Sequence, residues 1–352
     1  MDLSWSFFVA QLLSNPLLLV VALLNLGVII VNGATDAPNA IATAVSTRAM
    51  KPRHAIIMAA ICNFIGLLVI SVVSPAVAQT IFGMVDFGGN SHQALVALMA
   101  AMVAIIVWGA TAWWFGIPTS QSHSLIAGLT GAAIALMSGV DAINWNEWIK
   151  VIYGILLSTL MGFAFGWVNF KIIKRAFRNA NRQHANRFFK WAQVLAGAGV
   201  AFMHGAQDGQ KFMGIFILAI IMASGLGMST DALSSLPVWL MLLCALTMGV
   251  GTAAGGERII KSVGVDMVKL EAFQGFAASL STCVSLAVAT FGGLPVSTTH
   301  TNTTAIMGVG AAKNPKGVKW SIAIDMVKTW VLTFPGCGLL GFVFAKVFLI
   351  IL

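Results

Sequence analysis

Long apolar runs separated by short polar segments make up most of this 352-residue chain. A membrane-spanning helix needs about 20 predominantly apolar residues to cross a hydrocarbon core of about 30 Å. Candidate stretches fall at residues 17–33, 55–74, 93–115, 123–138, 148–170, 191–223, 237–254, 272–292, 299–312 and 321–351. Several are short or contain polar breaks. The pattern predicts an all-α polytopic membrane protein with broken or re-entrant helices among its spans.

The composition agrees with a chain that is solvated mostly by lipid. Hydrophobic residues account for 59% of the sequence and charged residues for only 9%, which is typical of an integral protein of the plasma or inner membrane. Asp2 and the absence of a basic segment before the first apolar stretch predict a retained span and not a signal peptide. The four cysteines are scattered singly and are predicted to pack as small hydrophobic residues.

Basic residues are distributed very unevenly between the polar segments. The segments 48–53, 171–190, 257–271 and 313–319 hold 16 of the 20 Lys and Arg residues, whereas 75–92, 139–147 and 224–236 hold none. Because cytoplasmic loops are enriched in Lys and Arg, the basic segments are predicted inside and both termini outside. This placement explains the net charge of +9 without a nucleic-acid partner. The cluster at 171–190 is predicted to be a cytoplasmic linker, with contact to anionic lipid headgroups as a secondary role.

Two short motifs occur twice, which predicts an internal duplication. NGATDAPN at 32–39 aligns with HGAQDGQK at 204–211, and GIPTSQSH at 116–123 aligns with GLPVSTTH at 293–300. The offsets are 172 and 177 residues, so each half carries both motifs. Five stretches per half, with the predicted loop orientation, make the second half run in the opposite sense. We therefore expect a first transmembrane repeat at 1–170, the basic linker at 171–190 and a second, inverted repeat at 191–352, as in many secondary transporters.

The first motif places a carboxylate inside an apolar stretch. A charged residue at the bilayer centre costs about 2.5–3.5 kcal/mol on insertion scales, so it normally faces a cavity or a partner. Pro38 lacks an amide proton, so the helix is expected to break near Asp36 and to free carbonyl groups beside it. Carboxylate, carboxamide and carbonyl oxygens suit a small hard cation or a proton. The duplicate at Asp208 predicts a second such break.

The second motif predicts a different kind of site. Proline followed by hydroxyl residues, directly before a new apolar stretch, is typical of a capped helix N-terminus. Free backbone N–H groups and hydroxyl donors at two such ends could surround a tetrahedral oxyanion. Two ordinary capped turns would give the same pattern. For His123 and His300, capping or packing and a proton-relay role both remain open.

In these motifs the chain resembles the inorganic phosphate transporter (PiT) family, over essentially its whole length. The resemblance implies secondary active transport of phosphate, with a cation gradient of Na⁺ or H⁺ and no other cofactor. It implies a cation site that includes Asp36, Asn39 and Asp208, where Na⁺ would bind, together with Thr35 and Gln207. It implies a phosphate site made by Ser120, Gln121, Ser122, Ser297, Thr298 and Thr299. The family also leans towards homodimers. Free phosphate and a metal-phosphate complex both remain open as the substrate.

One position departs from the family pattern. Sodium-coupled members tend to carry asparagine where this sequence has Lys211. An ammonium three residues after Asp208 would supply, permanently tethered, the charge of one cation, and this leads to the hypothesis of proton coupling or fewer sodium ions. The alternative is that Lys211 extends to a membrane interface away from the site.

Two other functions compete with phosphate symport. A permease for sulfate or another oxyanion would use the same architecture, although a buried carboxylate can accept the proton that phosphate carries and sulfate lacks. An intramembrane phosphatase would also need a phosphate pocket. However, all seven arginines lie in predicted cytoplasmic loops, so the core lacks the Arg clamp common in phosphoryl-transfer sites. A transporter, not an enzyme, is therefore expected.

Overall fold

The computed structural model describes residues 3–88, 90–115, 119–225, 236–254 and 269–352. Within these residues the regular structure is helical apart from one isolated bridge between Val85 and Ile143. The α-helices are α1 (Trp5–Ser14), α2 (Pro16–Thr35), α3 (Ala37–Ser46), α4 (Pro52–Val73), α5 (Ala76–Phe82), α6 (Ser91–Phe115), α7 (Gln121–Met137), α8 (Trp145–Ala176), α9 (Arg182–Ser224), α10 (Val238–Ala254), α12 (Ala272–Phe291), α13 (Thr298–Lys313) and α14 (Trp320–Ile351). Two short 3₁₀ turns, η1 (Val140–Ala142) and η4 (Pro315–Gly317), complete the described elements.

The helices agree closely with the apolar stretches of the sequence. Each of the ten stretches is covered, to within a residue or two at its ends, by one long helix, namely α2, α4, α6, α7, α8, α9, α10, α12, α13 or α14. Among the described residues, six helical segments are long and apolar enough to cross a membrane. An all-helical polytopic membrane protein is therefore confirmed. The short helix α1 precedes the first predicted stretch, and α3 and α5 lie between stretches.

The predicted break near Asp36 is present. Helix α2 ends at Thr35 and α3 begins at Ala37, with Asp36 between them as the cap of both. Pro38 lies in the first turn of α3, where its missing N–H and fixed φ are tolerated. The backbone N–H of Asp36 still donates to Asn32 O at 2.8 Å. The carboxylate is thus held at a junction between two helices.

The predicted break near Asp208 is absent, so this part of the sequence interpretation is wrong. Helix α9 runs without interruption from Arg182 to Ser224, and HGAQDGQK contains no proline that would remove a backbone hydrogen bond. Its glycines serve close packing instead. A Cβ on Gly205 would overlap the backbone of Asn63, and one on Gly209 would overlap the side chain of Leu67, both on α4.

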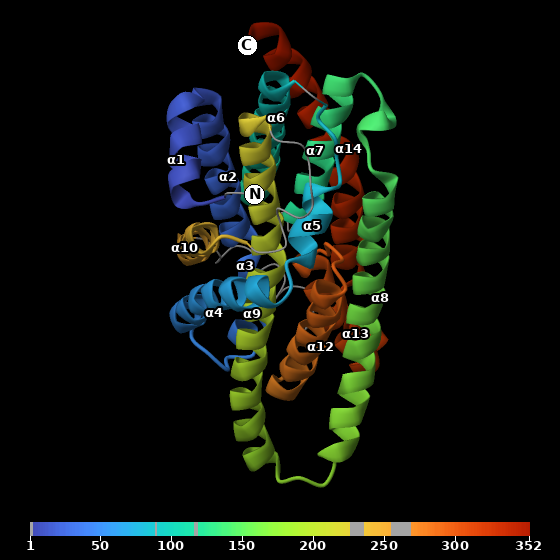
Figure 1. Ribbon diagram of the computed structural model, residues 1–352. Helices are drawn as coiled ribbons and strands as arrows, with labels where there is room; N and C mark the ends of the chain where they lie inside the picture. The colour runs from blue at the N-terminus through green and yellow to red at the C-terminus, as the bar shows by residue number, and fades with distance from the viewer. Residues whose placement is uncertain (1–2, 89, 116–118, 226–235, 255–268) are drawn as a thin grey trace.

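The two halves of the chain interlock by exchanging helices. Helix α14 packs on α6 and α7, and α8 packs on α12 and α13, while α4 packs on α9 and α10 on α2 (Figure 1). The exchanged contacts are close because small residues face the partner backbone. A Cβ on Gly131 of α7 would meet Gly338 O of α14, and one on Gly308 of α13 would meet Phe163 O of α8. Gly131 and Gly308 are separated by the offset of the second motif.

Most of the predicted linker is helical. Helix α8 continues to Ala176 and α9 starts at Arg182, so the non-helical part is limited to residues 177–181, at the lower end of Figure 1. The turn between α3 and α4, which carries Arg48 and Lys51, lies towards the same end, whereas the C-terminus lies at the other. Most of the basic segment 257–271 and of the acidic segment 224–236 lies outside the described residues.

Candidate functional site

The N-termini of α7 and α13 are built in the same way. Ser120 caps α7, and its hydroxyl oxygen accepts from His123 N at 3.3 Å. Ser297 caps α13, and its hydroxyl oxygen accepts from His300 N at 3.2 Å. Both ends are buried, so two helix N-termini with hydroxyl caps point into the interior of the protein. Residues 116–118, which include the glycine and proline of the first copy, lie outside the described residues.

Lys211 connects these helix ends to the aspartate motif. Its ammonium donates to Asp208 Oδ1 at 2.7 Å, to Ser122 Oγ at 2.6 Å and to Val296 O at 2.6 Å. The residue is 1% exposed, so the alternative in which Lys211 reaches a membrane interface is wrong. Since an ammonium has three donors, the three contacts use all of them.

Asp208 lies among polar and charged groups of two helices, α9 and α2. Besides Lys211, Asn32 of α2 donates to its Oδ2 at 2.9 Å, and His204 Nε2 lies 3.3 Å from the same oxygen. The other ring nitrogen of His204 bonds Asn63 Oδ1 of α4 at 3.0 Å. A buried carboxylate without a partner would be very costly, and here the negative charge is paired inside the protein.

Asp36 lies in a different environment although it is equally buried. Its Oδ2 accepts from Gln121 N at 3.3 Å, in the first turn of α7, and the Thr35 hydroxyl lies 3.4 Å from Oδ1. No Lys, Arg or His nitrogen of the described residues lies within ion-pair distance of this carboxylate. The Asp36 carboxylate therefore accepts one of the backbone N–H groups that the N-terminus of α7 leaves without a helical partner.

Asn39 connects the same helix junction to α13. Its Nδ2 donates to Thr299 Oγ1 at 2.9 Å, and Asn302 Nδ2 donates to its backbone carbonyl at 2.7 Å. Its Oδ1 is buried and has no hydrogen-bond partner among the described residues. The same holds for several polar atoms nearby, namely Asn32 Oδ1, Gln121 Oε1 and Nε2, Gln207 Oε1 and Thr298 Oγ1. The site thus contains several buried side-chain donors and acceptors to which the described residues offer no hydrogen-bond partner.

The two motif histidines contact each other where α7 and α13 begin. The ring centroids of His123 and His300 are 4.2 Å apart in an edge-to-face arrangement. Trp330 stacks on His300 at 3.6 Å, and Phe334 lies 4.6 Å from His123. Both aromatic residues belong to α14. The contacts support the packing interpretation of these histidines and show that the two helix ends lie side by side.

Comparison with known proteins identifies the family. The model of the phosphate transporter family matches residues 32–184 and 176–341. This chain belongs to that family. It is 40% identical to a probable low-affinity inorganic phosphate transporter of Bacillus subtilis (strain 168), over 88% of the chain and 91% of the relative. A relative of the same name from Rhizobium meliloti (strain 1021) is 36% identical over 94% of the chain and 96% of its own length.

A solved structure shares the fold. The structure titled "The sodium-dependent phosphate transporter" aligns with a TM-score of 0.86 at 23% identity, over 96% of this chain and 100% of that one. The family and the apolar helices make the chain an integral protein of the plasma membrane. The relatives carry the names of transporters and permeases, which agrees with the expected absence of an enzyme activity.

Within this phosphate transporter family member, the predicted site residues come together around Lys211. Lys211 contacts Asp208 and Ser122, Asp36 contacts the backbone of Gln121, and Asn39 contacts Thr299. The remaining candidates are also buried near these groups; Gln207, for example, donates to Leu294 O, just ahead of α13.

Four contributors were not predicted from the sequence. They are Asn32, His204, Asn302 and the backbone carbonyl of Val296. Asn32 and His204 are the first residues of the two aligned copies of the first motif, and this alignment is a signal that could have found them. The Val296 carbonyl carries no signal in the sequence, because any residue supplies one.

Proposed function

We propose that this protein is a secondary active symporter of inorganic phosphate that is driven by a cation gradient. One observation carries the proposal. The buried Lys211 ammonium bonds Asp208, which belongs to the carboxylate motif, and Ser122, which belongs to the hydroxyl motif. Groups suited to a cation and groups suited to an oxyanion therefore form one connected site between the two halves of the chain.

The oxyanion would bind at the N-termini of α7 and α13. Backbone N–H groups and the positive end of a helix dipole favour an anion there. The hydroxyls of Ser122 and Thr299 lie in the two first turns, and Lys211 adds a positive charge. Such a cradle satisfies the oxygens of phosphate with donors from both halves. Phosphate also carries a proton at neutral pH, for which a buried carboxylate is an acceptor.

Asp36 gives a physical reason for coupling. Its carboxylate accepts the N–H of Gln121, one of the donors that an oxyanion at α7 would use. Two anions at one helix end repel each other and compete for that donor. A cation or a proton on Asp36 removes the negative charge and releases the N–H. Phosphate binding and cation binding would therefore favour each other, as symport requires.

The residues around Asp36 fit a small hard cation. Asn32, Asp36 and Asn39 lie at helical spacing, and the side-chain oxygens of both asparagines lack a hydrogen-bond partner among the described residues. Oxygen ligands of this kind suit Na⁺, and the same carboxylate can hold a proton. At Asp208 the Lys211 ammonium already supplies the charge. We therefore propose that one mobile cation, Na⁺ or H⁺, accompanies each phosphate.

Alternating access would follow from the exchanged helices. The matched contacts of α14 with α7 and of α8 with α13 support two structural repeats around one central site. Inverted repeats of this kind let a site open to either face by relative movement of the halves. With the basic loops inside, both termini would lie outside.

The direct test is uptake of radiolabelled phosphate into proteoliposomes that contain the purified protein. Sodium and pH gradients are imposed separately, with arsenate and sulfate as competitors and with divalent cations present or removed. Saturable gradient-driven uptake that arsenate blocks and sulfate does not is the expected result. If sulfate competes better than phosphate, or if no gradient drives uptake, the proposal is wrong.

A further inference from the structure

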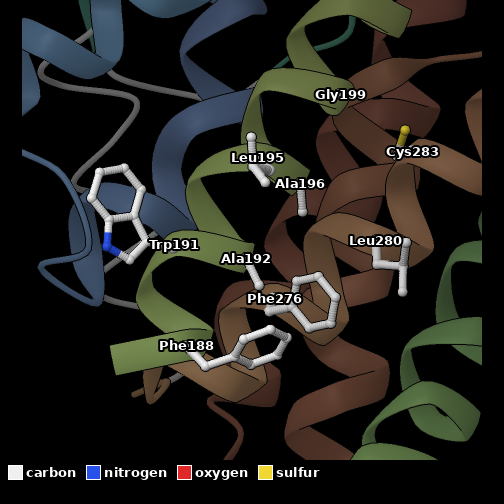
Figure 2. A pocket seen from close by; sticks show the side chains of 9 residues that line it. All are labelled: Phe188, Trp191, Ala192, Leu195, Ala196, Gly199, Phe276, Leu280 and Cys283. Carbon is white, nitrogen blue, oxygen red and sulfur yellow. The ribbon is translucent and has the colours of Figure 1, made fainter. Parts of the chain in front are cut away.

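An apolar groove on the outer surface of α9 lies at the point where the chain changes from apolar to basic. The groove has a volume of about 460 Å³ and lies between α9 and α12. Figure 2 shows Phe188 and Trp191 at one end and Gly199 and Cys283 at the other. All the residues that line it are apolar.

Small side chains on α9 create the groove. Ala192, Ala196 and Gly199 recur at helical spacing on the face of α9 that faces Phe276 and Leu280 of α12. A row of small residues opposite large ones leaves space between the two helices. The helices close up at Gly199, where a Cβ would lie 3.1 Å from Cys283 Sγ.

The sequence of α9 sets the depth of the groove in the membrane. Residues 182–190 contain three basic residues and a histidine, whereas 191–203 contain no charged residue. Trp191, which is 69% exposed, stands at this boundary, where tryptophan prefers the headgroup level. Gly199 lies about 12 Å deeper along the helix at 1.5 Å per residue. An occupant of the groove therefore passes from the headgroup layer into hydrocarbon, as one phospholipid does.

The charges at the shallow end select the kind of phospholipid. His184 lies one turn before Phe188 and Arg187 one turn before Trp191, so both flank the open end of the groove on the same side of α9. Both are exposed, and no described acidic group pairs with Arg187. On the facing helix, Glu271 is the N-cap residue of α12, where it forms a capping box with Gln274.

We propose that this groove binds an anionic phospholipid, with an acyl chain between α9 and α12 and the phosphate group beside Arg187. One basic residue near an anionic headgroup contributes about 1 kcal/mol, which corresponds to about fivefold in affinity. A zwitterionic lipid would fill the groove without this gain. The site is separate from the transport site and does not depend on the proposed function.

The apolar groove between α13 and α14 provides an internal comparison. It is lined by Met307, Trp320 and other apolar residues, and its lysine, Lys328, lies 3.3 Å from Asp325. Because that positive charge is already paired, Lys328 offers no free charge to an anionic headgroup, in contrast to Arg187. This groove also contains a tryptophan that can report on its occupant.

The test is quenching of tryptophan fluorescence by brominated lipids in proteoliposomes. The signal of Trp191 is the difference between the wild type and Trp191→Phe. Brominated phosphatidylglycerol should quench this signal at about fivefold lower membrane content than brominated phosphatidylcholine. Arg187→Gln should remove the preference, and Ala196→Phe, which fills the groove, should remove it too. The variant Lys171→Gln, which deletes one charge of the same basic cluster from α8, should keep it.

Three results would overturn the proposal. The first is equal quenching of Trp191 by both lipids, which would mean an unselective surface. The second is that neither brominated lipid quenches Trp191 and that crosslinking gives a dimer, which would mean that a second copy covers the groove. The third is a preference that Arg187→Gln leaves unchanged. None of these readouts requires transport.

Discussion

The two aspartates of the duplicated motif are equally buried but neutralised in different ways. Asp208 lies inside the continuous helix α9 and bonds Lys211 at 2.7 Å and Asn32 at 2.9 Å. Asp36 lies at the junction of α2 and α3 and accepts from Gln121 N at 3.3 Å. One carboxylate has a tethered cation, and the other has only neutral donors.

The difference shows how a duplicated site can divide its roles. A cation that is a side chain of the protein, as the Lys211 ammonium is, stays at its carboxylate throughout the transport cycle. A charge that has only neutral donors is stable when a mobile cation joins it, since buried charges need a partner. Asp208 would thus hold the architecture and the oxyanion through Lys211, whereas Asp36 would respond to the ion gradient.

The largest expected effect is the loss of the tethered cation. Lys211→Met leaves Asp208 buried without its ammonium, and breaking such a pair costs about 3–5 kcal/mol. We expect a clear drop in the unfolding temperature in detergent, measured by loss of the monodisperse peak on heating. The matched double variant Asp208→Asn with Lys211→Met should recover most of that stability. If Lys211→Met is as stable as the wild type, the pairing is not structural.

The next effect concerns the carboxylate at the helix junction. Asp36→Asn removes the charge that competes for the N–H of Gln121, so cation binding should no longer change phosphate affinity. Coupling free energies of about 1–3 kcal/mol correspond to about 5–150-fold, and we expect stimulation of phosphate binding by the coupling cation to fall by such a factor. Phosphate counterflow without a gradient should persist. A variant that still accumulates phosphate against its gradient would contradict the role of Asp36.

A third variant makes the two aspartates alike. Lys211→Asn should convert the Asp208 site into one that needs a mobile cation. At low cation concentration the KM for phosphate should rise by at least about tenfold, since a hydrogen bond to a charged group contributes about 1.5–3 kcal/mol. High sodium should restore it, whereas choline at the same ionic strength should not. Unchanged ion dependence would show that Lys211 does not replace a cation.

The smallest expected effects come from the helix caps Ser120 and Ser297, which are built alike in the two halves of the chain. Ser120→Ala and Ser297→Ala each remove a helix cap, which costs about 1 kcal/mol. Because the caps have equivalent bonds of 3.3 and 3.2 Å, we expect similar losses of thermal stability and similar modest increases in KM. Strongly unequal effects would mean that α7 and α13 do not share the oxyanion equally.

The sequence predicts the spans well, and its motifs mark residues that the structure brings together, because both depend on local signals. Apolar length marks a helix wherever it occurs, and a proline in the aspartate motif marks the break at Asp36. The prediction of a second break, at Asp208, was wrong for an identifiable reason. In HGAQDGQK the glycines provide close packing on α4, and nothing removes a backbone hydrogen bond.

The sequence does not reveal the contacts between helices that lie far apart along the chain. The contact between His123 and His300 requires α7 and α13 to begin side by side, with Trp330 and Phe334 of α14 beside them. No local pattern specifies this exchange of helices. The Val296 carbonyl that accepts from Lys211 is likewise invisible, because its position and not its residue type creates the contact.

The most direct test of the central claim is the number of cations that accompany each phosphate. It is measured in proteoliposomes containing the wild-type protein, as the opposing phosphate gradient at which a known sodium or pH gradient gives no net flux. One mobile cation per phosphate is the result expected if Lys211 permanently occupies the role of the other. Two mobile cations per phosphate would contradict the account, since Asp208 would then have to bind a cation beside Lys211.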